Sequence, residues 1–154
     1  MALDLSGPGL SDPGLSGSGL TSAQFAAIAA FRYELRRFLA FSEAAAAEVG
    51  LPAQQHQALL AIMGQAEKGP PSIGGLADLL LIAPHTAAEL VARMVEAGLV
   101  IKTPCPNDRR RAELTLTPKS KALLHRLTAA HLEELKTLEP TLARALGKLS
   151  RARP

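Results

Sequence analysis

Hydrophobic positions recur with helical spacing through most of this chain, and only one segment follows the pattern of β-strands. Apolar residues three or four positions apart predict helices over residues 21–49, 53–66, 73–80, 84–97 and from 118 onward. Between residues 99 and 116 the pattern changes to two short runs, one β-branched and one alternating, which predict a hairpin. We therefore expect a mainly α protein with one small antiparallel sheet.

Two of the expected helices are joined by a very short turn. The hydroxyl of Ser72 can cap the first, and Pro84 suits the first turn of the second, where its missing N–H costs nothing. The predicted buried stripe of the second helix is Ala87, Leu90, Val91, Met94 and Val95. Such a pair is a helix-turn-helix candidate, in which the start of the second helix enters the DNA major groove. The side chains of that helix that could then contact DNA are Pro84, His85, Thr86, Ala88, Glu89 and Arg93.

A hairpin with arginines at its tip is expected after this pair. Residues 99–103 and 112–116 are the predicted strands, and residues 104–108 have turn chemistry. Arg109, Arg110 and Arg111 follow the turn directly. They could form a solvated loop, but beside a helix-turn-helix a DNA-binding wing is the favoured interpretation, because a narrow minor groove attracts inserted arginine.

The wing segment resembles that of the MarR family of winged-helix transcriptional regulators. The matching residues are Gly98-Leu99-Val100, Asp108-Arg109-Arg110 and Leu114-Thr115-Leu116-Thr117-Pro118, and residues 81–91 are similar to the family's recognition region. The resemblance, which covers roughly residues 25–150, implies that Asp108 orients the wing and that Arg110 enters the minor groove. Glu89 stands where many members carry Arg or Lys; its carboxylate could accept a hydrogen bond from cytosine or hold a neighbouring arginine.

Charge is concentrated in this part of the chain. The formal net charge is +3, yet residues 99–126 hold seven Lys or Arg and two acids, so this span is +5 and the remainder is 3 − 5 = −2. A basic patch on a near-neutral body indicates nucleic-acid binding. No apolar run is long enough for a membrane span, and the amino end lacks a secretory signal pattern. With a single cysteine as well, we expect a cytoplasmic protein without membrane attachment.

The flanking segments suggest a dimer. Residues 1–20 are rich in Gly, Ser and Pro and predict a flexible tail, residues 52–117 form the expected DNA-binding domain, and residues 21–51 and 118–154 form a helical dimerisation region. Pro140 is expected to interrupt the last helix. A heptad-like seam there is too apolar for a monomer, and its expected interface residues are Leu127, Leu135, Leu142, Leu146 and Leu149. The resemblance implies an intertwined homodimer on an inverted-repeat operator, with recognition helices about 34 Å apart.

All five aromatic residues lie on the first expected helix. Core and dimer packing is the favoured interpretation, and the alternative is the wall of a small-molecule effector pocket formed by Phe31, Phe38, Phe41 and His56. His56 is more simply a hydrogen-bonded structural residue than an effector ligand. No cofactor is expected.

The leading hypothesis is a sequence-specific regulator of double-stranded DNA, acting as a ligand-responsive repressor. An enzyme is disfavoured, because the chain shows no metal-spaced cluster, phosphate-binding glycine loop or nucleophile–base arrangement. A winged-helix module for protein partners is a second alternative. A third is redox sensing through Cys105, whose thiolate the nearby arginines could favour.

Overall fold

The computed structural model describes residues 21–151, with side chains described through residue 148. The expected tail and the side chain of Leu149 therefore lie outside the described residues. The elements, in chain order, are α1 (Ser22–Glu48), α2 (Ala53–Gly64), α3 (Ile73–Leu80), α4 (Pro84–Glu96), β1 (Val100–Cys105), β2 (Asp108–Leu116) and α5 (Pro118–Arg151). The chain is mainly helical with one two-stranded antiparallel sheet, as the sequence pattern predicts.

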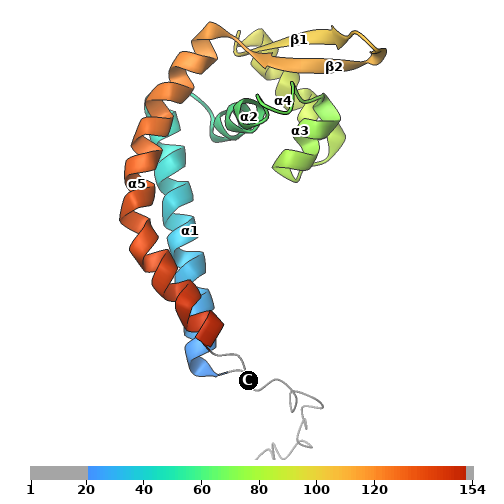
Figure 1. The fold of residues 1–154 in the computed structure, drawn as a ribbon. Helices are drawn as coiled ribbons and strands as arrows, with labels where there is room; N and C mark the ends of the chain where they lie inside the picture. The colour runs from blue at the N-terminus through green and yellow to red at the C-terminus, as the bar shows by residue number, and fades with distance from the viewer. Residues whose placement is uncertain (1–20, 152–154) are drawn as a thin grey trace, which may run out of the picture.

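Two long helices form a stalk, and the shorter elements gather at one of its ends. Figure 1 shows α1 and α5 side by side and antiparallel, with α2, α3, α4 and the hairpin beside the end of α1 and the start of α5. Thr21 begins α1 with a capping box, in which its hydroxyl accepts the Gln24 N–H and the Gln24 side chain accepts the Thr21 N–H.

Pro140 lies inside α5, so the expected break at this residue was wrong. A proline in a helix interior removes one backbone hydrogen bond and costs about 3 kcal/mol. The helix continues because both sides of the proline are held by packing: Leu138 and Ala145 are buried, and α5 lies along α1. Tertiary contacts outweigh the local preference here.

The main core belongs to the winged-helix end of the chain. Leu59, Leu76, Met94 and Leu114 are completely buried there. The same cluster includes Leu127, so that side chain packs inside its own chain and does not lie on a free face, in contrast to the interface assigned to it from the sequence.

One side chain expected in the core is on the surface: Val95, of the predicted buried stripe of α4, is 41% exposed. It lies at the edge of that stripe, where the spacing alone does not fix how much of the stripe a neighbouring element covers.

The hairpin is longer than expected. Val100 pairs with Leu116, and the ladder continues to Cys105 opposite Asp108, with an irregularity between Pro104 and Cys105. The turn is therefore reduced to residues 106–107, and the three arginines lie in β2 and not at the tip as expected from the sequence. An irregularity of this kind accommodates residues of one strand that have no partner in the other. Pairing can therefore resume at Cys105 and Asp108, within a segment whose composition is typical of turns.

The base of the hairpin is fastened to the helices on both sides. Gly98, with φ +68°, follows α4 in a Schellman arrangement, in which the Leu99 N–H bonds the Met94 carbonyl at 2.9 Å. The hydroxyl of Thr117 donates to the Gly98 carbonyl at 2.9 Å. The hairpin direction is thus fixed relative to α4.

Within the described residues, no single helix has the length and apolar character needed to cross a membrane. Among these helices, α3 and α4 have that length and apolar character only when they are taken as a pair, and the chain bends by 109° between them.

Candidate nucleic-acid interface

The turn between α3 and α4 begins with an unusual residue. Leu81 caps α3 in the left-handed region, with φ 55°, and it is 93% exposed. Leucine is uncommon in this conformation, where glycine or asparagine is usual. Because no glycine marks this turn, the sequence pattern does not predict a left-handed residue here.

The start of α4 presents free backbone donors and polar side chains. Ala83 provides no side-chain cap and Pro84 occupies the first turn, so this helix end keeps its partial positive charge. His85 and Glu89 are exposed, and Thr86 is half-buried. The remaining two predicted contact residues, Ala88 and Arg93, are also exposed.

The opposite face of α4 is buried as the pattern predicts. Ala87, Leu90, Val91 and Met94 are all at most 2% exposed. Because this stripe seats the helix in the core, the orientation of the outward face is fixed by packing.

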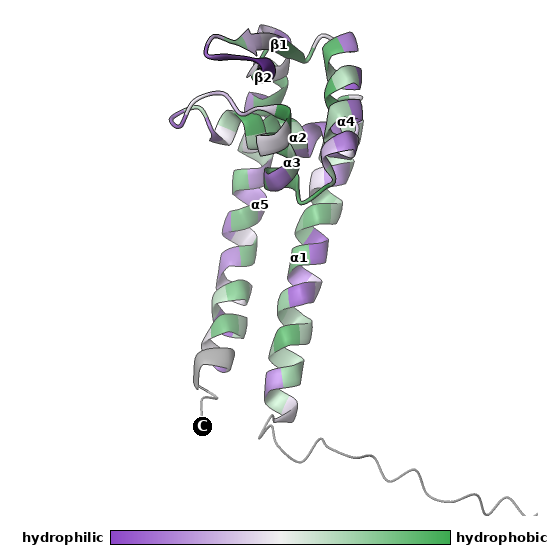
Figure 2. Cartoon of the chain, turned by 90° about the vertical axis from the view of Figure 1, so that its right-hand side faces the viewer, coloured by the Kyte–Doolittle hydropathy of each residue, from purple (hydrophilic) through white to green (hydrophobic). Residues whose placement is uncertain are grey.

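The wing is organised by one carboxylate and one serine. The carboxylate of Asp108 accepts the Arg110 backbone N–H at 3.0 Å, which holds the start of β2 in a local turn. The guanidinium of Arg111 donates to the Ser72 hydroxyl at 3.4 Å, which connects the wing to the cap of α3. Arg109, Arg110 and Arg111 are all exposed. Figure 2 shows the outer part of the hairpin in the strong purple of hydrophilic residues.

Lys102 on β1 joins these two parts of the surface; it was counted in the basic segment 99–126 but not among the expected DNA contacts. A depression of about 280 Å³ at the start of α3 is lined by Lys102, Arg110 and Arg111. Lys102 also lines a second depression, of about 360 Å³, with Ala88 and Ala92 of α4. The cationic wing and the outward face of α4 therefore form one continuous surface.

The cations of this surface are not used in ion pairs within residues 21–148. The ion pairs found there join Arg37 to Glu34 and Lys136 to Glu133, all on the stalk. Exposed guanidinium and ammonium groups without carboxylate partners are suited to bind phosphate oxygens.

A second candidate site lies where the winged helix meets the stalk. Ser42 of α1, His56 of α2 and His131 of α5 meet there. The Ser42 hydroxyl is 2.7 Å from Nε2 of His131 and 3.5 Å from Nδ1 of His56. The two imidazole ring centres are 5.0 Å apart, and the edges of Phe38 and Phe41 pack against His131 at 5.7 and 5.5 Å.

Both histidines are buried, at 1% exposure for His56 and 7% for His131. Nε2 of His56 has no hydrogen-bond partner among the described residues. Burial lowers the pKa of His56 below its ordinary value of 6.5, and the nearby His131 lowers it further.

Three of the four predicted pocket residues meet at this site. Phe38, Phe41 and His56 surround His131, whereas Phe31 is half-buried two turns earlier on α1. Neither Ser42 nor His131 was predicted as a site residue from the sequence. The spacing of His131 among the leucines of α5 was the signal that could have identified it.

The stalk carries a large apolar surface. Among the predicted interface residues Leu135 is 41% and Leu146 51% exposed, and Leu142 is half-buried. Other large apolar side chains exposed on the stalk are Phe25, Ile28, Tyr33, Leu35, Leu39 and Leu132.

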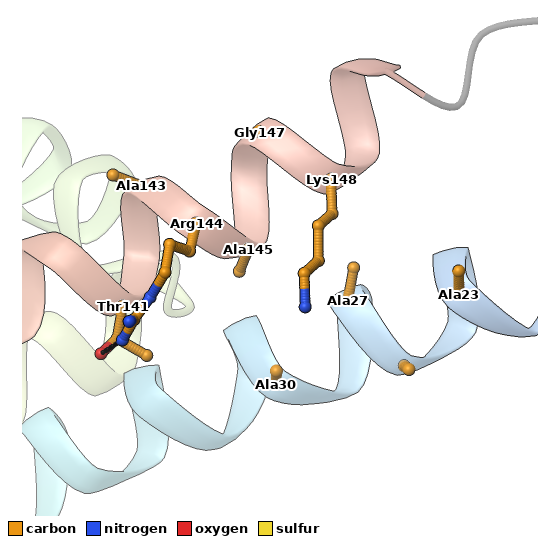
Figure 3. Close-up of a pocket in the computed structure, with 10 residues that line it drawn as sticks. Ala23, Ala27, Ala30, Thr141, Ala143, Arg144, Ala145, Gly147 and Lys148 are labelled. Carbon is orange, nitrogen blue, oxygen red and sulfur yellow. Dashed lines mark hydrogen bonds between the residues drawn. The ribbon is translucent and has the colours of Figure 1, made fainter.

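Small side chains leave a depression of about 990 Å³ between the start of α1 and the end of α5. Figure 3 shows Ala23, Ala27 and Ala30 on one helix facing Ala145 on the other, with Lys148 extending towards α1. The stalk helices therefore do not fill the space between them at this end.

Residues 21–148 contain no group of three or more His, Cys, Asp or Glu side chains placed to hold a metal ion. Cys105 is a half-buried free thiol beside the turn of the hairpin.

Comparisons with known proteins agree with this architecture. Residues 49–111 match the model of the MarR family. The fold is similar to that of AbsC, described as a MarR family transcriptional regulator from Streptomyces coelicolor, with a TM-score of 0.67 and 18% identity over 88% of this chain and 92% of that one. A comparison with curated proteins gave no match.

Two other solved structures with a similar fold are described together with a ligand. A variant of S. aureus MepR bound to an oligodeoxyribonucleotide has a TM-score of 0.62 and 18% identity, over 80% of this chain and 95% of that one. Bordetella bronchiseptica BpsR, described as regulated in its DNA binding by 6-hydroxynicotinic acid, has a TM-score of 0.58 and 22% identity, over 79% of this chain and 91% of that one.

Proposed function

We propose that this chain, whose winged-helix part belongs to the MarR family, is a transcriptional regulator that binds double-stranded DNA as a homodimer. The observation that carries the proposal is the continuous surface on which Lys102 links the exposed face of α4 to Arg110 and Arg111 of the wing. A helix face joined to a basic hairpin can occupy adjacent grooves of one duplex. Residues 52–117 are the proposed DNA-binding domain.

The contacts divide by chemistry. Arg93 and the wing cations other than Arg110 meet phosphates, which position the protein without reading sequence. His85, Thr86 and Glu89 at the start of α4 reach base edges in the major groove, and Arg110 enters the minor groove. The S. aureus MepR variant, which shares this fold, is bound to an oligodeoxyribonucleotide.

The second copy would cover the apolar stalk. A partner would find apolar area at the exposed side chains of Leu135 and Leu146. It would find space for its own side chains in the alanine-lined depression at the end of the stalk. Residues 21–51 and 118–154 are thus the proposed dimerisation region. Two recognition helices about 34 Å apart would then read an inverted repeat.

We further propose that the protein is a repressor that responds to a small molecule. Phe38, Phe41 and His56 at the junction with the stalk are the candidate effector contacts, and the description of BpsR provides a parallel for a small aromatic acid. A ligand that fits only one arrangement of winged helix and stalk would change the spacing of the recognition helices.

The test is binding of the purified full-length protein to its own promoter DNA, compared with scrambled DNA over a salt series. We expect a footprint on an inverted repeat and a steep fall of affinity with salt, since each phosphate contact contributes a slope of about 0.9. Lys136→Ala, which changes a stalk lysine, is the matched control and should keep the same slope. Equal affinity for promoter and scrambled DNA at every salt concentration would overturn the proposal.

A further inference from the structure

The buried histidine pair forms a directional hydrogen-bond chain from α5 to α2. Nδ1 of His131 contacts the carbonyl oxygen of Leu127. A carbonyl can only accept, so Nδ1 carries the hydrogen and Nε2 of neutral His131 is an acceptor. The Ser42 hydroxyl therefore donates to Nε2 of His131 at 2.7 Å and is left to accept from Nδ1–H of His56 at 3.5 Å.

This direction of the chain requires both rings to be neutral. With its hydrogen on Nδ1, His56 leaves Nε2 as a bare lone pair, and that atom has no partner among the described residues. A proton added there would create a buried cation with an unsatisfied N–H, 5.0 Å between ring centres from the second imidazole. A proton on Nε2 of His131 would instead make the Ser42 hydroxyl an acceptor there and a donor to Nδ1 of His56, whose hydrogen would then lie on the unpartnered Nε2.

No described carboxylate compensates such a charge. On α1, the groups next to the pair are the Ser42 hydroxyl and the rings of Phe38 and Phe41, and Glu34 further along the helix is already paired with Arg37 at 3.0 Å. On α5, Glu134 is partly buried one turn after His131. Among the described residues, burial lowers the pKa of His56 most, and the nearby His131 lowers it further.

The three residues join the parts of the molecule that would move against each other. Ser42 and His131 belong to the stalk, whereas His56 belongs to α2, which packs in the core of the winged helix. A charged His56 regains water only if α2 lifts from α1 and α5, and the winged helix would move with it.

We propose that Ser42, His56 and His131 form a proton-sensitive lock that seats the winged helix on the stalk, and that protonation opens it and weakens DNA binding. The lock rests on the proposed function, because DNA affinity is its readout. The direction of the pH dependence follows from the lowered pKa of His56. The neutral network is stable above the ordinary pKa of 6.5, and its stabilisation is lost as the pH falls below that value.

The test compares DNA affinity of the wild-type dimer and of His56→Gln between about pH 8 and about pH 5.5, the range in which histidine titrates. Glutamine keeps hydrogen-bonding capacity and takes up no proton. Wild-type affinity should fall about tenfold more than that of His56→Gln, a difference of about 1.4 kcal/mol in the free energy of binding. His125→Gln, at an exposed position on α5, is the matched control and should behave as wild type.

His85 at the start of α4 is present in every protein compared, so its contribution cancels. A second measurement uses the folded wild-type protein alone: the histidine ring resonances followed by NMR against pH. The His56 resonance should titrate below 6.5 and move upward in His131→Gln.

The outcomes separate the two proposals. Absence of promoter-specific binding at about pH 8, where histidine is neutral, would contradict the proposed function. Promoter-specific binding with the same pH dependence in wild type and His56→Gln would overturn the lock alone, as would a His56 resonance that titrates at 6.5 or above.

Discussion

The winged helix and the stalk use the same kinds of side chain in opposite ways. The winged helix buries Leu59, Leu76 and Leu114 completely and leaves its cations on the surface, unpaired within the described residues. The stalk leaves large apolar side chains exposed, and each of the ion pairs found among residues 21–148 lies within one of its helices. The winged helix therefore shares a core with the adjoining end of the stalk and has a surface suited to an anionic partner, whereas the rest of the stalk has a surface suited to an apolar one.

The largest expected effect comes from opening the core of the winged helix. Leu76→Ala should lower the free energy of unfolding by about 2–5 kcal/mol, because a completely buried leucine leaves a cavity. Leu79→Ala on the exposed side of α3 is the control and should change stability by less than about 0.5 kcal/mol. Urea denaturation followed by circular dichroism measures both. Equal effects of the two changes would mean that the core lies elsewhere.

The stalk should respond in its assembly state instead. Leu146→Asp places a charge on the proposed dimer surface and should weaken the dimer about a hundredfold, the equivalent of about 3 kcal/mol for a buried unpaired charge. Sedimentation velocity over a concentration series measures this change. Leu79→Asp, on α3, should stay dimeric. A fully dimeric Leu146→Asp protein would show that the partner binds another face.

Within the DNA surface, α4 should determine sequence preference. Glu89→Ala should change the relative affinity for operators that differ at one base pair by about 1–3 kcal/mol, if the carboxylate accepts from a base. Competition binding with a set of single-substituted operators is the measurement. A uniform loss on all operators would remove Glu89 from the base-reading residues.

The wing should determine affinity and salt dependence. Arg110→Ala should weaken binding to every sequence and reduce the salt slope by about one. Lys136→Ala provides the comparison, since that lysine pairs with Glu133 on the stalk. An unchanged salt slope in Arg110→Ala would place this arginine away from the DNA backbone.

The smallest effect is expected at the junction, in stability against pH. The urea midpoint of wild type should fall as the pH drops below 6.5, because the pKa of buried His56 lies below that of the unfolded chain. In His56→Gln this fall should be smaller. A midpoint of wild type that rises over the same range would mean that the histidine pair is stabilised by protons.

Much of the winged helix could be predicted from local pattern. The cap at Ser72, the proline at the start of α4, the apolar stripe of that helix and the stop at Gly98 each follow from spacing and backbone preference, and each is present. The candidate DNA surface follows as well, because a helix whose one face is buried must expose the other. Lys102 was counted in the basic segment but not among the DNA contacts, since its place beside α4 depends on which elements flank β1.

The sequence by itself determined the order of the elements, the outward face of α4 and the concentration of positive charge in the wing, because periodicity and charge are local properties of the chain. Tertiary structure decided the rest. Packing along α1 carries α5 through Pro140, strand pairing continues beyond the irregularity at Pro104 and takes the arginines into β2, and the core encloses Leu127. The meeting of Ser42, His56 and His131 likewise depends on contacts between helices distant in sequence, and no local pattern contains that information.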